Sequence, residues 1–201
     1  METLSGYQYD PEDALQEAQR RIRLAGERSR NSLDLHSLGL TRLPVELNTL
    51  SGLERLNLEK NRFEQLPDRI GKLDKLRWLN LSQNSLTGLP ASIGGLKSLR
   101  SLILSANKLR SLPVEISELT ELTELFLSAN DLQTVPAEIG RLEKLEGLYL
   151  SYNRLLSLPP ELQALHRLEW LHLEGNPELG LDEKTTARAD DPLTILSVYF
   201  G

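Results

Sequence analysis

Histidine and serine are the residues in this chain that could support metal binding or nucleophilic catalysis, and their spacing favours neither. The histidines His36, His166 and His172 lack the spacing of metal ligands, so we expect no metal site. Cysteine is absent, which excludes a thiolate nucleophile, a zinc–thiolate centre and disulfides. Serines that recur every 23 residues with no base beside them indicate a structural role instead; they are Ser82, Ser105, Ser128 and Ser151.

Two glycine-rich segments share residues with a phosphate-binding loop but lack its spacing. Gly71-Lys72 and the run from Gly94 to Ser98 do not complete the motif GxxxxGK[ST]. Both segments also fall at the end of the same 23-residue period, as turn residues would. We therefore expect no nucleotide, no other cofactor and no enzymatic activity.

The 23-residue period organises most of the chain. A row of asparagines keeps it, at Asn61, Asn84, Asn107, Asn130, Asn153 and Asn176. A row of prolines keeps it too, at Pro44, Pro67, Pro90, Pro113, Pro136 and Pro159. The unit that starts at Leu53 reads LERLNLEKNRFEQLPDRIGKLDK, and an imperfect unit from about Arg30 precedes it, with Leu38 in place of the asparagine. A fixed period of this length is typical of solenoids, in which each unit is one coil.

Within one unit the hydrophobic spacing changes from two to three, which predicts the shape of a coil. Leu56 and Leu58 alternate with polar residues, as in a short strand with one buried face. Ile70 and Leu73 lie three apart behind Pro67, which indicates a short helical or 3₁₀ turn. Stacked coils would form one parallel concave sheet with the turns on the convex side. The predicted fold class is therefore an α/β solenoid.

The asparagine row should serve the fold rather than a partner. At the asparagine the chain turns out of the strand, so backbone N–H and C=O groups point inward without sheet partners. An asparagine amide donates and accepts at once, and can therefore bond the backbone of its own coil and of the adjacent coil. We expect this arrangement in every regular coil.

The N-terminal end carries helix signals. We expect an N-terminal segment and capping helix over residues 1–29, with Asp10 as N-cap and Pro11 in the first turn. Its apolar face should consist of Leu15, Ala18, Ile22 and Ala25. The solenoid should then cover residues 30–181, as one imperfect and six regular units of which the last is partial.

The C-terminal end, residues 182–201, should consist of a polar loop and a capping helical turn. The stretch 182–191 is rich in charged and polar residues, which favours a loop. Asp191 can cap the turn that Pro192 opens. The apolar face of this turn should consist of Leu193, Leu196, Tyr199 and Phe200.

The outward strand positions vary where the rest of the unit is constant. The third and fifth residues of a unit flank its buried leucine, so they should face away from the core on the concave side. There we predict a largely exposed, partner-binding set: Arg55, Trp78, Asn80, Ile103, Glu124, Phe126, Tyr149, Tyr152, Trp170 and His172. Five of the ten aromatic residues belong to it, and clustered exposed aromatics are the usual anchors of protein interfaces.

The alternative is that these aromatic residues only pack against one another across the strands and stiffen the sheet. The two interpretations differ for Phe126→Ser. A binding surface would keep its stability and lose affinity, whereas a purely structural stack would lose stability and keep affinity. The sequence leaves both open.

Composition and charge narrow the class of partner. The net charge is −6, and basic residues are scattered among acidic ones, so we expect no nucleic-acid partner. No apolar run approaches the ~18 residues of a membrane span, and no cysteine needs an oxidising compartment. We therefore expect a cytoplasmic monomer whose partner is another protein or another domain of the same parent protein, with no membrane association.

The unit LxxLxLxxNxLxxLPxxIxxLxx resembles the intracellular leucine-rich repeats of Ras-related signalling scaffolds and their bacterial relatives. The leading helix, the junction LDLHSLGLTRLP and the exit LHLEGNPELGL followed by DPLTILSVYF are similar to the repeat domain of bacterial Roco proteins. In that family a Ras-like GTPase domain and a dimerising domain follow the repeats. The resemblance implies a leucine-rich-repeat horseshoe.

Two functions of different classes stay open. The chain is either a complete binding adaptor or the sensing domain of a larger Roco-like GTPase, whose reading frame would continue into GxxxxGK[ST]. A third function, as a bacterial ubiquitin-ligase effector, fits less well, because cysteine is missing and because those effectors resemble shorter repeats.

Overall fold

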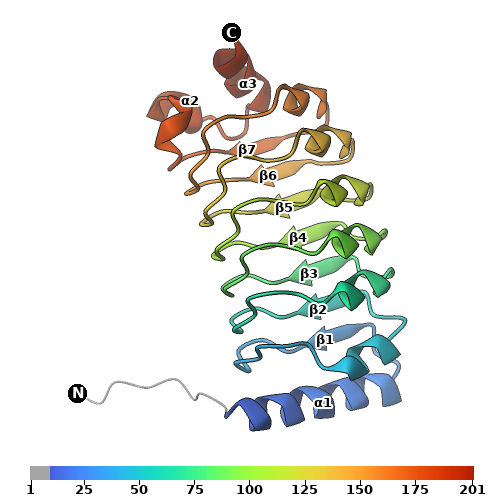
Figure 1. Ribbon diagram of the computed structural model, residues 1–201. Helices are drawn as coiled ribbons and strands as arrows, with labels where there is room; N and C mark the ends of the chain where they lie inside the picture. The colour runs from blue at the N-terminus through green and yellow to red at the C-terminus, as the bar shows by residue number, and fades with distance from the viewer. Residues whose placement is uncertain (1–9) are drawn as a thin grey trace, which may run out of the picture.

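The computed structural model describes residues 10–201. They form a single stack of coils that runs from a helix at one end to two helices at the other (Figure 1). Each coil contributes one short strand to the sheet and one 3₁₀ helix to the opposite side. The predicted α/β solenoid, with its parallel concave sheet and capping helix, is confirmed.

The sheet contains seven parallel strands in sequence order. They are β1 (Ser32–Asp34), β2 (Arg55–Asn57), β3 (Trp78–Asn80), β4 (Ser101–Ile103), β5 (Glu124–Phe126), β6 (Gly147–Tyr149) and β7 (Trp170–His172). Each residue pairs with the residue 23 positions later, so the central leucines Leu56 and Leu79 are partners. Equivalent positions of successive coils therefore form straight rows across the sheet.

The convex side carries a 3₁₀ helix in each coil. These are η1 (Val45–Thr49), η2 (Asp68–Lys72), η3 (Ala91–Gly95), η4 (Val114–Glu118), η5 (Ala137–Arg141), η6 (Pro160–Ala164) and η7 (Pro177–Leu179). A proline of the periodic row immediately precedes each of the first six, in extended conformation. Its missing N–H costs nothing there, because the first N–H groups of a helix have no internal acceptor.

The core lies between the sheet and the 3₁₀ helices. In the fourth coil, which contains β4, Leu102, Leu104, Leu109, Ile116 and Leu119 are all fully buried. A buried leucine contributes roughly 1.5–3 kcal/mol, but only when coils on both sides cover it. The stack is therefore stabilised by contacts between neighbours, and its two ends need covers.

The asparagine row bonds the backbone as predicted. Asn107 Nδ2 donates to Leu104 O of its own coil and to Leu81 O of the preceding coil, both at 2.9 Å. Its Oδ1 accepts from Leu86 N, also in the preceding coil, at 3.0 Å. The same three bonds recur at the other five asparagines. Each asparagine thus satisfies groups of two coils.

One residue before each asparagine of the row, and before Leu38 in the first coil, the chain turns through the left-handed region. Six residues other than glycine adopt φ between 54° and 56° there, at Ser37, Lys60, Gln83, Ala106, Ala129 and Tyr152. The seventh, Gly175, has φ 75°. A side chain at this position stands at the edge of the sheet rather than in a strand, which matters for Tyr152 below.

The helix α1 (Pro11–Glu27) covers the first coil. Asp10 caps it by accepting from Glu12 N, as predicted. The buried face contains Ala14, Ala18, Ile22 and Ala25, so the expectation for Leu15 was wrong: Leu15 is only half-buried. Small alanines allow the helix to lie close to the coil. Residues 1–9 of the predicted N-terminal segment lie outside the described residues.

Two helices cover the last coil. The stretch predicted as a loop contains α2 (Glu183–Thr186), which Asp182 caps by accepting from Thr185 N. As predicted, Asp191 caps the following α3 (Pro192–Phe200). Its predicted apolar face is wrong at Leu193, which is 71% exposed, because Ile195 takes the buried position beside Leu196.

Candidate functional site

The residues with possible catalytic chemistry do not come together. His36 Nδ1 lies 2.8 Å from Asp34 Oδ1 at the start of the sheet, and His166 and His172 lie at the other end. Among residues 10–201 no group of three or more His, Cys, Asp or Glu could hold a metal ion. Gly71 lies in η2, where a Cβ would come within 2.0 Å of Ser92 O, so close contact between coils accounts for the glycine.

The concave side carries a row of isoleucine and ring side chains at the fifth position of the last four units. Because the strands pair in register, Ile103, Phe126, Tyr149 and His172 are neighbours on β4 to β7. Trp170 lies two residues before His172 on the same face of β7. We call these five residues the aromatic strip.

The rings of the aromatic strip form one continuous stack. Phe126 and Tyr149 are nearly parallel, with centroids 4.3 Å apart and planes 6° apart. Tyr149 and His172 follow at 5.0 Å, and Trp170 approaches His172 at 6.5 Å. Offset stacking of this kind contributes about 0.5–1.5 kcal/mol a pair beyond area burial. The strip is therefore a preformed surface with fixed side chains.

The expectation that these side chains are largely exposed is wrong for most of them, because stacked rings cover one another. Of the predicted aromatic residues only Tyr152, at 65%, and Trp170, at 44%, are largely exposed. Phe126 and Tyr149 are half-buried, since each ring covers part of its neighbour, and so is Ile103. Cross-strand packing and an open surface therefore occur together.

Tyr149 lies flat on the sheet because Gly147 leaves room for it. A Cβ at Gly147 would come within 2.7 Å of Tyr149 Cε2. The pKa of Tyr149 is raised above its ordinary value, first by burial and second by the negative charge of Glu124. Glu124 pairs with Gly147 across β5 and β6 and therefore borders the strip.

The N-terminal members of the predicted site do not join the ring stack, although Asn80 is the register neighbour of Ile103. The guanidinium of Arg55 covers the ring of Trp78, with Cζ 4.7 Å from the ring centroid. Asn80, predicted to contact a partner, is only 7% exposed. Its Oδ1 accepts from both Ser82 N and Ser82 Oγ, so this side chain serves the turn after β3.

Tyr152 also differs from its expected place. It occupies the left-handed turn after β6, with φ 54°, rather than a strand position. Its ring lies over Gly175 of the next coil, where a Cβ would come within 2.5 Å of Tyr152 Cδ1. Tyr152 and Gly175 border a depression of about 660 Å³ at the C-terminal end, which sequence reasoning missed.

The sequence pattern described as "leucine-rich repeat region" matches residues 68–175, more than half of the chain. The chain belongs to the leucine-rich repeat family. A second pattern, "leucine rich repeat", matches residues 31–86. Together the two cover the coils from β1 to β7. Leucine-rich repeat domains are typically non-catalytic protein-interaction modules.

Solved structures of other leucine-rich repeat proteins are similar to this one. A leucine-rich repeat protein of Leptospira interrogans is 32% identical, with a TM-score of 0.58 over 77% of this chain and 52% of that chain. The leucine-rich repeat domain of the type III effector XopL is 29% identical, with a TM-score of 0.78 over 87% of this chain and 62% of that one.

A further similar structure is that of PEPR1–AtPEP1, which is 33% identical with a TM-score of 0.62 over 67% of this chain and 20% of that chain. This leucine-rich repeat chain thus spans 52% and 62% of the length of the first two structures. A comparison with curated proteins gave no match. Of the helices that the structure describes, none has the length and apolar character that crossing a membrane requires.

Proposed function

We propose that this leucine-rich repeat protein is a non-catalytic interaction module, which binds a partner protein through the aromatic strip. The observation that carries the proposal is the continuous stack from Phe126 through Tyr149 to His172, each of which keeps part of its surface exposed. Rigid aromatic side chains contribute large contact area at low entropic cost, which is why they dominate protein interfaces.

The packing alternative accounts for only part of this surface. Stacking between strands stabilises the sheet, but it does not require Trp170, which is 44% exposed at the end of the stack. Glu124 supplies a polar rim beside Tyr149. An exposed apolar core with a charged rim is the arrangement found in protein-binding surfaces.

The partner is another protein or another domain of the same parent protein. Net charge −6 argues against nucleic acid, and the absence of cysteine supports a cytoplasmic location. We propose further that this chain acts as a monomer and needs no cofactor.

The test is capture of partners from a lysate with two triple variants. The concave variant carries Phe126→Ala, Tyr149→Ala and Trp170→Ala. The control removes three exposed apolar side chains outside the strip, with Val45→Ser, Val114→Ser and Leu156→Ser; these residues are 65%, 50% and 57% exposed.

A protein that wild type and the control variant bind, and that the concave variant loses, supports the proposal. The melting temperatures must show that both variants are folded at the assay temperature. Equal loss in both variants, or binding that survives in the concave variant, would place the interface elsewhere.

A second candidate is a regulatory role inside a larger Roco-like GTPase. The observation that favours it is the outer surface of α3, where Leu193 and Val198 are 71% and 57% exposed. Such side chains would suit contact with a further domain. Sequencing the reading frame tests the idea: a GxxxxGK[ST] motif after residue 201 supports it, and its absence from the frame contradicts it.

A further inference from the structure

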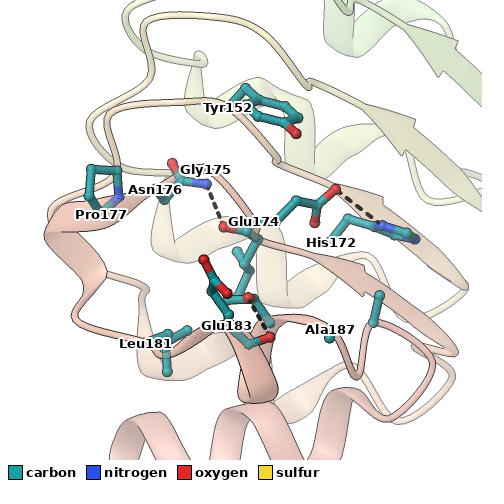
Figure 2. A pocket seen from close by; sticks show the side chains of 12 residues that line it. Tyr152, His172, Glu174, Gly175, Asn176, Pro177, Leu181, Glu183 and Ala187 are labelled. Carbon is teal, nitrogen blue, oxygen red and sulfur yellow. Dashed lines mark hydrogen bonds and ion pairs between the residues drawn. The ribbon is translucent and has the colours of Figure 1, made fainter.

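The depression at the C-terminal end lies between the last turns of the sheet and α2 (Figure 2). Tyr152, Glu174 and Gly175 form one wall. Figure 2 shows Glu183 and Leu181 on the opposite wall, with the Glu183 carboxylate directed inward from α2. Its volume of about 660 Å³ is large enough for several side chains.

The hydrogen-bond ladder of the sheet is left incomplete in this depression. In the preceding coil Leu150 N donates to His172 O and Tyr152 N donates to Glu174 O, both at 2.8 Å. The equivalent donors one coil later are the N–H groups of Leu173 and Gly175. Neither has a protein acceptor within residues 10–201.

The segment before α3 begins an eighth strand without completing it. Leu171 N donates to Ala189 O at 2.7 Å, as it would to a further coil. The chain then turns into α3 at Pro192, so the next two positions of the ladder stay open. Leu173 is only 1% exposed, and a buried N–H group is almost always satisfied in native structures.

The open donors match an extended peptide. In the preceding coil the corresponding donors are accepted by His172 O and Glu174 O, which are alternate carbonyl groups of one segment. A segment that runs parallel to β7 would therefore accept from both. Addition of a strand to an open sheet edge is a common mode of peptide recognition.

The charges of the lining residues indicate which side chain a bound segment should place in the depression. Glu174 and Glu183 lie on the two walls, and neither Lys nor Arg lines the depression. His172, the one basic group that does, already lies 3.8 Å from Glu174. The Tyr152 ring, 65% exposed, offers a face to a cation. A planar guanidinium suits two carboxylates and an aromatic ring better than an ammonium group.

We propose that this depression binds an extended segment of a partner protein, which adds to β7 through the N–H groups of Leu173 and Gly175 and places an arginine between Glu174 and Glu183. The inference rests on the proposed function, because His172 belongs both to the aromatic strip and to the lining of the depression. One partner would contact both surfaces.

The test uses nuclear magnetic resonance of the ¹⁵N-labelled chain with a defined probe. The probe is the capped peptide acetyl-Thr-Val-Arg-Val-Thr-amide, and its control has glutamate in place of arginine. We expect saturable downfield shifts of the Leu173 and Gly175 amide protons with the arginine peptide, as hydrogen bonds form, and binding about fivefold weaker or worse with the glutamate peptide.

Variants separate the site from general charge. Glu174→Gln with Glu183→Gln should weaken the arginine peptide about fivefold or more. Glu161→Gln with Glu178→Gln removes the same charge from exposed positions outside the depression and should leave binding unchanged. Ala187→Trp, which fills the depression from the residue that follows α2, should abolish the shifts.

Three results would each overturn the site: no change at Leu173 and Gly175 at millimolar peptide, equal binding of both peptides, or equal loss in the two double variants. None of these results bears on the aromatic strip, which is tested separately by partner capture with the two triple variants. Loss of that partner only in the concave triple variant, with no peptide binding here, would uphold the proposed function and reject this inference.

Discussion

The asparagine row and the aromatic strip run across the same coils and behave in opposite ways. A fifth-position side chain and the asparagine of its coil lie four positions apart, as Tyr149 and Asn153 illustrate. The asparagines are identical in every regular coil and make the same three bonds. The strip changes from isoleucine to phenylalanine, tyrosine and histidine along the row, and its rings stack on one another.

This difference separates the demands of the fold from the freedom it leaves. An asparagine is fixed because the backbone of two coils depends on it. A fifth-position side chain faces away from the core, so the fold accepts residues as different as Asn57, Ile103 and Tyr149 there. Variable rows inside a constant repeat are therefore the places where a function can be encoded, and four substitutions can break or sharpen that distinction.

The largest effect should come from Asn107→Ala. It removes the acceptor of Leu86 N and one of the two asparagine donors to each of Leu81 O and Leu104 O, which should lower the free energy of unfolding by about 1–3 kcal/mol. Chemical denaturation measures it. Asn57→Ala is the matched control, because Asn57 makes only a local bond to Glu59 N. Equal losses in the two variants would refute the special role of the row.

Phe126→Ser should affect binding more than stability. Loss of the stack with Tyr149 should lower the free energy of unfolding by about 1 kcal/mol. Affinity for the partner captured by wild type should fall by about 2 kcal/mol or more. Thermal unfolding measures the loss of stability, and titration calorimetry on the same samples measures the loss of affinity. A large stability loss with unchanged affinity would show that the strip only stabilises the sheet and does not bind the partner.

Gly147→Ala should give a smaller effect of the same kind. The new methyl group displaces the Tyr149 ring, whose position on the sheet depends on the glycine. The core leucines do not move, so the free energy of unfolding should change by less than about 0.5 kcal/mol. Near-ultraviolet circular dichroism should report the disturbed stack, and partner affinity should fall. An unchanged spectrum would mean that the ring does not lie there.

The smallest effect concerns the ionisation of Tyr149. Burial and Glu124 raise its pKa in the folded state, so folding opposes loss of the proton. Stability should consequently decline as pH rises above the unfolded tyrosine pKa of about 10. Glu124→Gln should lower the pKa of Tyr149 in an ultraviolet titration. Identical titration curves for the variant and the wild type would show that Glu124 does not affect the ionisation of Tyr149.

Much of the fold could be predicted because the 23-residue period acts in every coil at once. The strand positions, the 3₁₀ turns after the prolines and the bonds of the asparagine row all follow from it. The exposure of Phe126 could not be predicted, because it depends on how one ring covers the next. Periodicity specifies which face a side chain occupies but not its rotamer.

The errors at the end of the solenoid have two causes. Tyr152 was assigned to the concave face, although Gly175 occupies the same position one coil later and signals a left-handed turn. Asp182 before a run of helix formers could have predicted α2. The depression itself depends on how α2 and α3 return to the sheet, which no local pattern encodes.

Every asparagine of the row reaches backward along the chain. Asn61 bonds Leu35 O and Leu40 N, which lie 26 and 21 residues earlier. The first coil has no coil before it, and Leu38 fills its asparagine position. Duplication or loss of one whole unit would consequently preserve every bond, whereas a gain of any other length would break the register. A gene of this kind can change its copy number of coils in a single recombination event without any compensating mutation.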